Sequence, residues 1–112
     1  MQLKKMQQLI YDALVDAKAQ DIAMLDVRKL ADFTDTMVIA SGTSTRHVQS
    51  VADKVVDKLR THGVRALGVE GERIGEWVLI DFGQLVVHVM RPQTRDFYNL
   101  EKLWSDGKPV EI

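Results

Sequence analysis

The alternation of hydrophobic and polar residues is clearest between Glu76 and Met90. Two alternating segments flank Phe82-Gly83, and a short loop containing a glycine is typical of a β-hairpin. With those two residues as the turn, Trp77 lies opposite His88. Because side chains alternate between the two faces of a strand, one face is a continuous apolar surface suited to a core. That face carries Val78, Ile80, Leu85, Val87 and Val89.

The opposite face of the same hairpin mixes large apolar side chains with an acid, an amide and a histidine. It carries Trp77, Leu79, Asp81, Gln84, Val86, His88 and Met90. An aromatic and aliphatic centre with charged residues at its margin is typical of a protein-binding surface. A terminal helix that covers this face, with the polar groups at its rim, is the alternative, since strands covered on both faces are common in α/β folds. The pattern leaves both interpretations open.

The rest of the chain alternates between helical and strand periodicity. Apolar residues recur every three or four positions in residues 3–19, 45–60 and 94–104, which predicts three helices. Short apolar runs at residues 22–27, 36–40 and 64–69 predict strands. The interleaved order indicates an α/β fold with a mixed sheet of about five strands flanked by helices. A parallel crossover joins the second strand to the third, and the hairpin adds antiparallel pairing.

Length and composition narrow the possibilities further. A chain of 112 residues, 46% of them hydrophobic, is expected to form one domain, over residues 1–105, with residues 106–112 as a flexible tail. The net charge of −1 argues against nucleic-acid binding by bulk electrostatics. There are no cysteines, and the first twenty residues hold no continuous apolar stretch. We therefore expect a cytoplasmic protein without membrane contact.

The stretch SGTSTRHV, residues 41–48, is the first candidate for chemistry. A Gly-Ser/Thr turn at a helix N-terminus can offer backbone N–H groups and hydroxyls to an anion. Ser44, Arg46 and His47 would then contact a phosphate or RNA, and the Ser41–His47 turn could serve a nucleotide-binding or nucleotidyltransferase-like enzyme. The structural alternative is a well-capped helix after a tight turn. The spacing matches neither a P-loop nor a dinucleotide-binding motif.

Metal-dependent phosphoryl transfer would need paired carboxylates near this turn to hold Mg²⁺. No strand face between residues 64 and 90 carries two acids at alternating positions, and Asp81 stands alone on its strand. The three histidines, His47, His62 and His88, are scattered without metal-ligand spacing. We therefore expect no metal, no cofactor and no enzymatic activity.

Four stretches together resemble the ribosomal silencing factor family, also called Iojap-like: SGTSTRHVQSVADKV, GVEGERIGEWVLIDFG, VVHVM and RDFYNLEKLW. The likeness runs from about Ile22 to Trp104. It implies a fold related to nucleotidyltransferases without their catalytic acids. It also implies a cytosolic factor that binds the large ribosomal subunit through ribosomal protein L-fourteen. The binding site implied is on the face of the large subunit that meets the small subunit. Occupying that face would prevent the two subunits from joining and slow translation when nutrients run short.

The implied mechanism is steric, so the site is a docking surface. We expect Trp77 and Leu79 as anchors, with neighbours on the hairpin and last helix completing the patch. The resemblance also implies that members are often dimeric when free, and a factor on the ribosome can touch ribosomal RNA at its rim. The residues expected to bind the partner are Trp77, Leu79, Asp81, His88, Met90, Tyr98 and Lys102.

Overall fold

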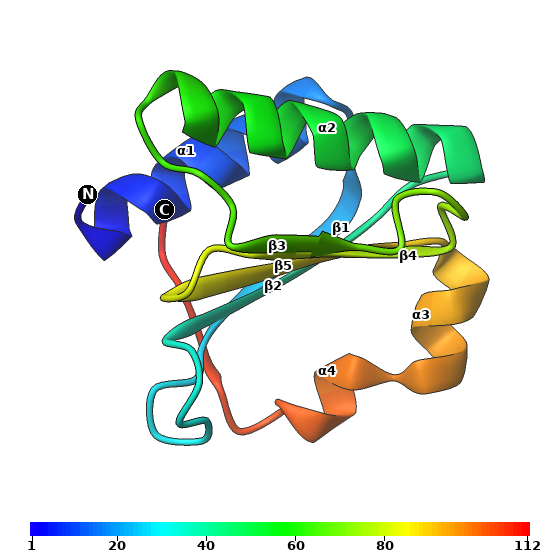
Figure 1. Cartoon of the computed structure of the whole chain (residues 1–112). Coiled ribbons are helices and arrows are strands. Elements are labelled where there is room, and N and C mark those ends of the chain that lie inside the picture. Colours follow the sequence, from blue (N-terminus) through cyan, green and yellow to red (C-terminus); the bar gives the residue numbers. More distant parts are fainter.

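The computed structural model describes residues 1–112, which form a six-stranded mixed sheet with helices on both faces (Figure 1). The strand order is β3-β4-β5-β2-β1-β6. The predicted α/β class with a mixed sheet is confirmed. The strands are β1 Gln20–Asp26, β2 Thr36–Ser41, β3 Gly68–Glu70, β4 Trp77–Asp81, β5 Leu85–Met90 and β6 Lys108–Pro109. The helices are α1 Leu3–Asp16, α2 Thr45–Thr61, α3 Pro92–Tyr98 and α4 Leu100–Leu103.

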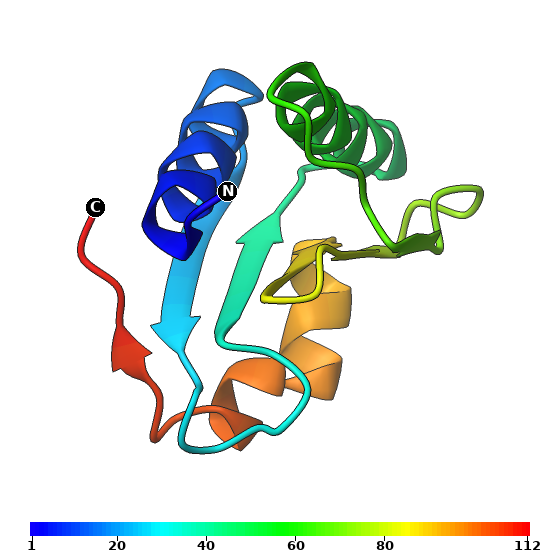
Figure 2. The same ribbon diagram turned by 60° about the vertical axis from the view of Figure 1, so that its left-hand side comes forward.

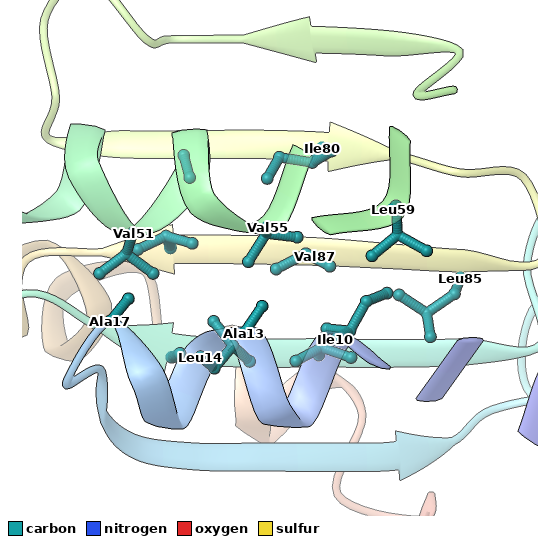
Figure 3. Close-up of a cluster of buried hydrophobic side chains, with 14 of the residues drawn as sticks. Ile10, Ala13, Leu14, Ala17, Val51, Val55, Leu59, Ile80, Leu85 and Val87 are labelled. Carbon is teal, nitrogen blue, oxygen red and sulfur yellow. The ribbon is translucent and has the colours of Figure 1, made fainter. Parts of the chain in front are cut away.

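Helices α1 and α2 lie side by side over one face of the sheet, while α3 and α4 lie on the other (Figures 1 and 2). The apolar stripes predicted for α1 and α2 point into the main core. Ile10 and Leu14 from α1 meet Val55 and Leu59 from α2, and all four side chains are fully buried (Figure 3). None of the helices is both long and apolar enough to cross a membrane.

The crossover from β2 through α2 to β3 is parallel in direction, but the two strands are not neighbours. β5 pairs in parallel with β2, and β4 and β3 follow with antiparallel pairing. β3 therefore runs in the same direction as β2, with the hairpin strands β4 and β5 between them. This insertion places the β4–β5 hairpin near the middle of the sheet, where both of its faces can be covered.

The hairpin turn lies one residue later than the sequence suggested. Gly83 and Gln84 are its central residues, and the Phe82 N–H donates to the Leu85 carbonyl at 2.9 Å. Gly83 supplies the positive φ of 86° that such a turn requires at its first central position. Trp77 therefore pairs with Met90 instead of His88. The face assignments are unchanged, because the pairing moves by two residues and the alternation has a period of two.

The sheet gains its sixth strand from the segment that we expected to be a flexible tail. Lys108 and Pro109 pair with the end of β1, and the Val110 N–H donates to the Met24 carbonyl at 2.9 Å. Only two residues pair, so no hydrophobic alternation marks this strand in the sequence. Pro109 is tolerated because β6 lies at the sheet edge, where a missing N–H costs little.

Two other elements differ from their predicted bounds. β3 covers residues 68–70 instead of the expected 64–69, because the segment after α2 is still hydrogen-bonded to that helix, with the Val64 N–H donating to the Leu59 carbonyl at 2.9 Å. The last helix is divided at Asn99, whose φ of 49° is left-handed and incompatible with a continuous α-helix.

Candidate protein-binding surface

The outer face of the hairpin is covered in one part and open in another. Beneath α3 and α4, five residues of the second apolar cluster are buried: Val27, Met37, Ile39, Val86 and Met90. Leu100 and Trp104 pack against this cluster and remain half-buried. On β4, Trp77 and Leu79 also remain half-buried. The terminal helices therefore cover β5, as the alternative interpretation expected, and leave much of β4 accessible, where the binding surface stays a prediction.

The structure separates the predicted binding residues by depth. Tyr98 is 54% exposed and Lys102 is also exposed, while Trp77, Leu79 and Asp81 are half-buried. Met90 has no exposed surface and His88 is only 6% exposed. We expected these two beside the anchors, but both lie beneath the surface. Both lie on β5, and the sequence pattern predicted the last helix but left open whether it covers this strand.

An aromatic row joins four side chains of this region. The Trp77 and Tyr98 ring centroids lie 4.9 Å apart, and Tyr98 meets Phe97 edge-on at 5.0 Å. The Trp77 Nε1–H donates to His88 Nδ1 at 2.9 Å. Such pairs hold large apolar surfaces in fixed positions and add to the energy of burial. The row is therefore a pre-arranged apolar patch with a hydrogen-bonded base.

His88 supports this row as a neutral ring. Burial lowers the pKa of His88 to about 4, because the charged imidazolium loses its hydration inside the protein. A neutral ring can keep Nδ1 free to accept the Trp77 indole proton. The role of His88 is thus to orient the indole from below.

Phe97 is the residue that the sequence reasoning missed. In the predicted helix over residues 94–104, helical spacing puts Phe97 on the same side as Leu100 and Trp104. The break at Asn99 rotates the two halves relative to each other, and Phe97 is 81% exposed. A left-handed asparagine is the only signal that could have indicated this, and it is weak in a sequence.

Acidic groups near the row are engaged within the protein. The Glu76 carboxylate receives a hydrogen bond from Thr94 Oγ1 at 3.1 Å and pairs with Arg91 at 3.3 Å, which holds the start of α3. Asp81 Oδ1 accepts the Gly83 N–H at 2.7 Å and so stabilises the hairpin turn. The other carboxylate oxygen of Asp81 makes no hydrogen bond within the protein, and the Asp81 side chain is half-buried.

The Ser41–His47 turn uses its polar groups to build the fold. Ser44 Oγ accepts the His47 N–H at 3.0 Å, which is a helix N-cap. The His47 ring accepts the Thr43 N–H at Nδ1, and Nε2 lies 2.9 Å from the Ala17 carbonyl. A β-carbon on Gly42 would lie 2.7 Å from Val48. Arg46 alone points an uncommitted charge outward, so the geometry corresponds to a capped helix.

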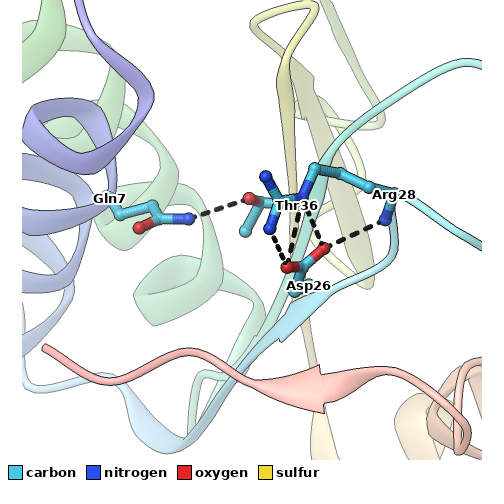
Figure 4. A network of polar contacts seen from close by, with 4 residues as sticks. All are labelled: Gln7, Asp26, Arg28 and Thr36. Carbon is cyan, nitrogen blue, oxygen red and sulfur yellow. Dashed lines mark hydrogen bonds and ion pairs between the residues drawn. The ribbon is translucent and has the colours of Figure 1, made fainter.

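A second polar network lies at the far end of β1 and was not singled out in the sequence (Figure 4). Arg28 binds both oxygens of Asp26, with the shortest distance 2.6 Å, and its hydrogen bonds hold the pKa of the Asp26 carboxyl below its ordinary value. Gln7 donates to Thr36 Oγ1 at 3.0 Å. The Gln7 bond joins α1 to β2, whereas the Arg28 pair is local to the end of β1. No three His, Asp or Glu side chains gather anywhere as a potential metal site.

Comparison with known proteins gives a consistent result. The family model described as "Ribosomal silencing factor during starvation" matches residues 1–112. Ribosomal silencing factor RsfS from Chromobacterium violaceum is 44% identical over 97% of this chain and 89% of its own. The maize chloroplast protein Iojap is 32% identical over 89% of this chain, which spans 43% of that protein.

A solved structure agrees with the sequence relatives. The crystal structure of a protein from Chromobacterium violaceum superimposes with a TM-score of 0.92 at 44% identity, covering 98% of this chain and 92% of that one. The resemblance predicted from the four sequence stretches is confirmed. The chain therefore belongs to the ribosomal silencing factor family.

Proposed function

We propose that this protein is a translational repressor that binds the large ribosomal subunit through ribosomal protein L-fourteen and prevents the small subunit from joining. Membership in the silencing-factor family supports the ribosome as the target. The observation that carries the proposal is the accessible part of the aromatic row, Trp77 on β4 with Phe97 and Tyr98 on α3. Exposed apolar clusters of this kind are typical of protein-binding sites.

The repression is steric. The protein measures 33 × 31 × 23 Å along its principal axes. Its continuous sheet and buried core make it a rigid body that cannot be compressed between two large surfaces. A body of this thickness at the contact face of one subunit keeps the other away without any chemical step.

The contact residues follow from exposure. We assign Trp77, Leu79 and Tyr98 as anchors and add Phe97, because its ring is exposed and packs on Tyr98. Asp81 and Lys102 lie at the margin, where charges guide orientation more than they add affinity. His88 and Met90 contribute from beneath by holding the β4–β5 surface in place.

The test is co-sedimentation with purified large subunits, and a gradient profile of mixed subunits with and without the protein. Wild-type protein should travel with the large subunit and reduce the joined particle. Tyr98→Ala should weaken association by about tenfold or more, as expected for a central aromatic anchor. Trp77→Ala is harder to interpret, because it removes a contact residue and also leaves the buried His88 Nδ1 without its hydrogen-bond donor.

Val15→Ala provides the matched control. Val15 is an exposed apolar residue on α1, across the sheet from the patch, so its removal should leave association unchanged. Equal loss in Val15→Ala and Tyr98→Ala would show that the aromatic row is not the docking surface. Wild-type protein that fails to sediment with large subunits would refute the proposed function itself.

The nucleotide-using alternative at Ser41–His47 has no comparable support. The hydroxyls of Ser41 and Ser44 and the imidazole of His47 are committed to internal hydrogen bonds. Saturable binding of ATP with Mg²⁺, lost in Arg46→Ala, would restore that alternative.

A further inference from the structure

Arg95 is a buried cation whose role the docking surface does not itself explain. Its side chain on α3 is only 8% exposed. The guanidinium donates from Nε to Glu101 Oε1 at 2.6 Å and from Nη1 to Ser41 Oγ at 2.9 Å. It therefore connects three elements, since Ser41 ends β2 and Glu101 lies on α4.

A buried arginine needs a reason, because desolvating a charge is costly and an apolar residue of similar size often stabilises a fold as well or better. The planar guanidinium differs from an apolar side chain by fixing two partners in defined directions. Here the hydrogen bond from Arg95 holds the pKa of the Glu101 carboxyl below its ordinary value. The charge pair is thus maintained at neutral pH.

The two partners of this ion pair stand on opposite sides of the break between α3 and α4. Asn99 adopts a φ of 49°, and its N–H donates to the Arg95 carbonyl at 2.8 Å. The left-handed asparagine gives α4 a direction different from that of α3, so contacts across the break decide how firmly the two helices are joined. The bond from Arg95 to Glu101 joins the two helices across this break, in addition to the packing of Leu100 and Trp104 on the sheet, and the bond to Ser41 attaches α3 to the end of β2.

Tyr98 is the residue most affected by this restraint. It is the last residue of α3, directly before Asn99, and its ring lies against Trp77. More than half of Tyr98 is exposed, so packing from above does not hold it. Its position therefore depends on how the end of α3 is anchored.

We propose that Arg95 is the positioning residue of the docking surface, which clamps Ser41 and Glu101 across the Asn99 break and so holds Tyr98 against Trp77 for the partner. This inference rests on the proposed function for its binding consequence. Holding an aromatic anchor in its bound orientation before contact reduces the ordering cost of association. Arg95 acts through Tyr98 and does not itself touch the partner.

The test is a double-mutant cycle on affinity for large subunits. Arg95→Met should weaken binding by about tenfold. The loss should not exceed that of Tyr98→Ala, because Arg95→Met only displaces the Tyr98 ring, whereas Tyr98→Ala removes it. In the Tyr98→Ala background, Arg95→Met should have no further effect. Arg95→Lys should restore binding only partly, since an ammonium lacks the fork that reaches both partners. Gln93→Ala, an exposed residue on the same helix, is the matched control and should leave affinity unchanged.

Glu101→Ala keeps the inference falsifiable if Arg95→Met does not fold, since Glu101 is partly exposed. In the free protein, wild type should show NMR contacts between the Tyr98 ring and the Trp77 indole, and Glu101→Ala should weaken them. Unchanged ring contacts, unchanged affinity, or additive losses in the cycle would overturn the role of Arg95 while leaving the proposed function intact. Large subunits that bind no wild-type protein would instead overturn the proposed function, whatever the ring contacts show.

Discussion

The two faces of the sheet are built from the same strands but finished in different ways. Toward α1 and α2, alternate residues of every long strand join an apolar cluster of 20 buried residues. Toward α3 and α4, the buried apolar cluster has only five residues, and the aromatic side chains around it remain partly exposed. A longer pair of helices would have sealed this second face. The face covered by α1 and α2 therefore accounts for most of the stability. The face covered by α3 and α4 buries fewer apolar residues and leaves part of its surface accessible.

The largest effect should come from removing a side chain of the first face. Leu59→Ala should lower the free energy of unfolding by about 2–5 kcal/mol, because the fully buried leucine leaves a cavity. Leu103→Ala, whose leucine is 73% exposed on α4, should change it by less than about 0.5 kcal/mol. Urea unfolding followed by circular dichroism measures both. Similar losses of unfolding free energy in the two variants would mean that both faces of the sheet contribute equally to stability.

This contrast also separates what the sequence revealed from what it could not. The alternation in residues 76–90 placed Val78, Ile80 and Val87 in the core correctly. Moving the turn by one residue changes the strand pairing by two, so every side chain stays on its predicted face. The same parity placed His88 and Met90 on the partner surface. Parity gives the face but not what covers it, and the short helices that bury these two residues are positioned by tertiary contacts.

The remaining errors have local causes. The final helix was continuous in the prediction because helical periodicity runs through Asn99, whereas the break depends on one backbone angle. β6 has two residues, too few for any pattern. The Arg95 clamp joins residues 54 positions apart, and nothing in the sequence links Ser41 to Arg95. Long-range polar pairs of this kind were accessible only from the structure.

The second face should show its own signature in the pH dependence of stability. His88 is neutral when folded, with a pKa of about 4, and regains its ordinary pKa of 6.5 when unfolded. Below pH 6.5 the unfolded chain binds a proton at His88 that the folded protein does not bind. The free energy of unfolding therefore decreases as the pH is lowered. The slope approaches about 1.4 kcal/mol per pH unit, which gives about 2 kcal/mol between roughly pH 7.5 and 5.

Urea titrations at several pH values test this dependence, with His88→Gln as the comparison. The glutamine oxygen can still accept the Trp77 indole proton, but the side chain does not titrate. The variant should therefore lose less stability than wild type over this range. Asp26 and Glu101, whose pKa values are lowered, contribute their losses at more acidic pH. Parallel curves for both proteins would show that His88 is not the titrating group.

A smaller effect should distinguish the helices of the two faces by their caps. α2, on the first face, begins with the Ser44 hydroxyl accepting the His47 N–H, whereas no side chain caps the first turn of α3. Ser44→Ala should therefore cost about 1 kcal/mol of stability and leave affinity for large subunits unchanged, since α2 lies across the sheet from the aromatic row. Thermal unfolding and co-sedimentation on the same sample measure both. Ser44→Gly is the control and should cost only a few tenths of a kcal/mol, as glycine is tolerated at this position. A Ser44→Ala protein that keeps its stability but binds large subunits more weakly would place a partner contact on the α2 side. The assignment of stability to one face of the sheet and binding to the other would then be wrong.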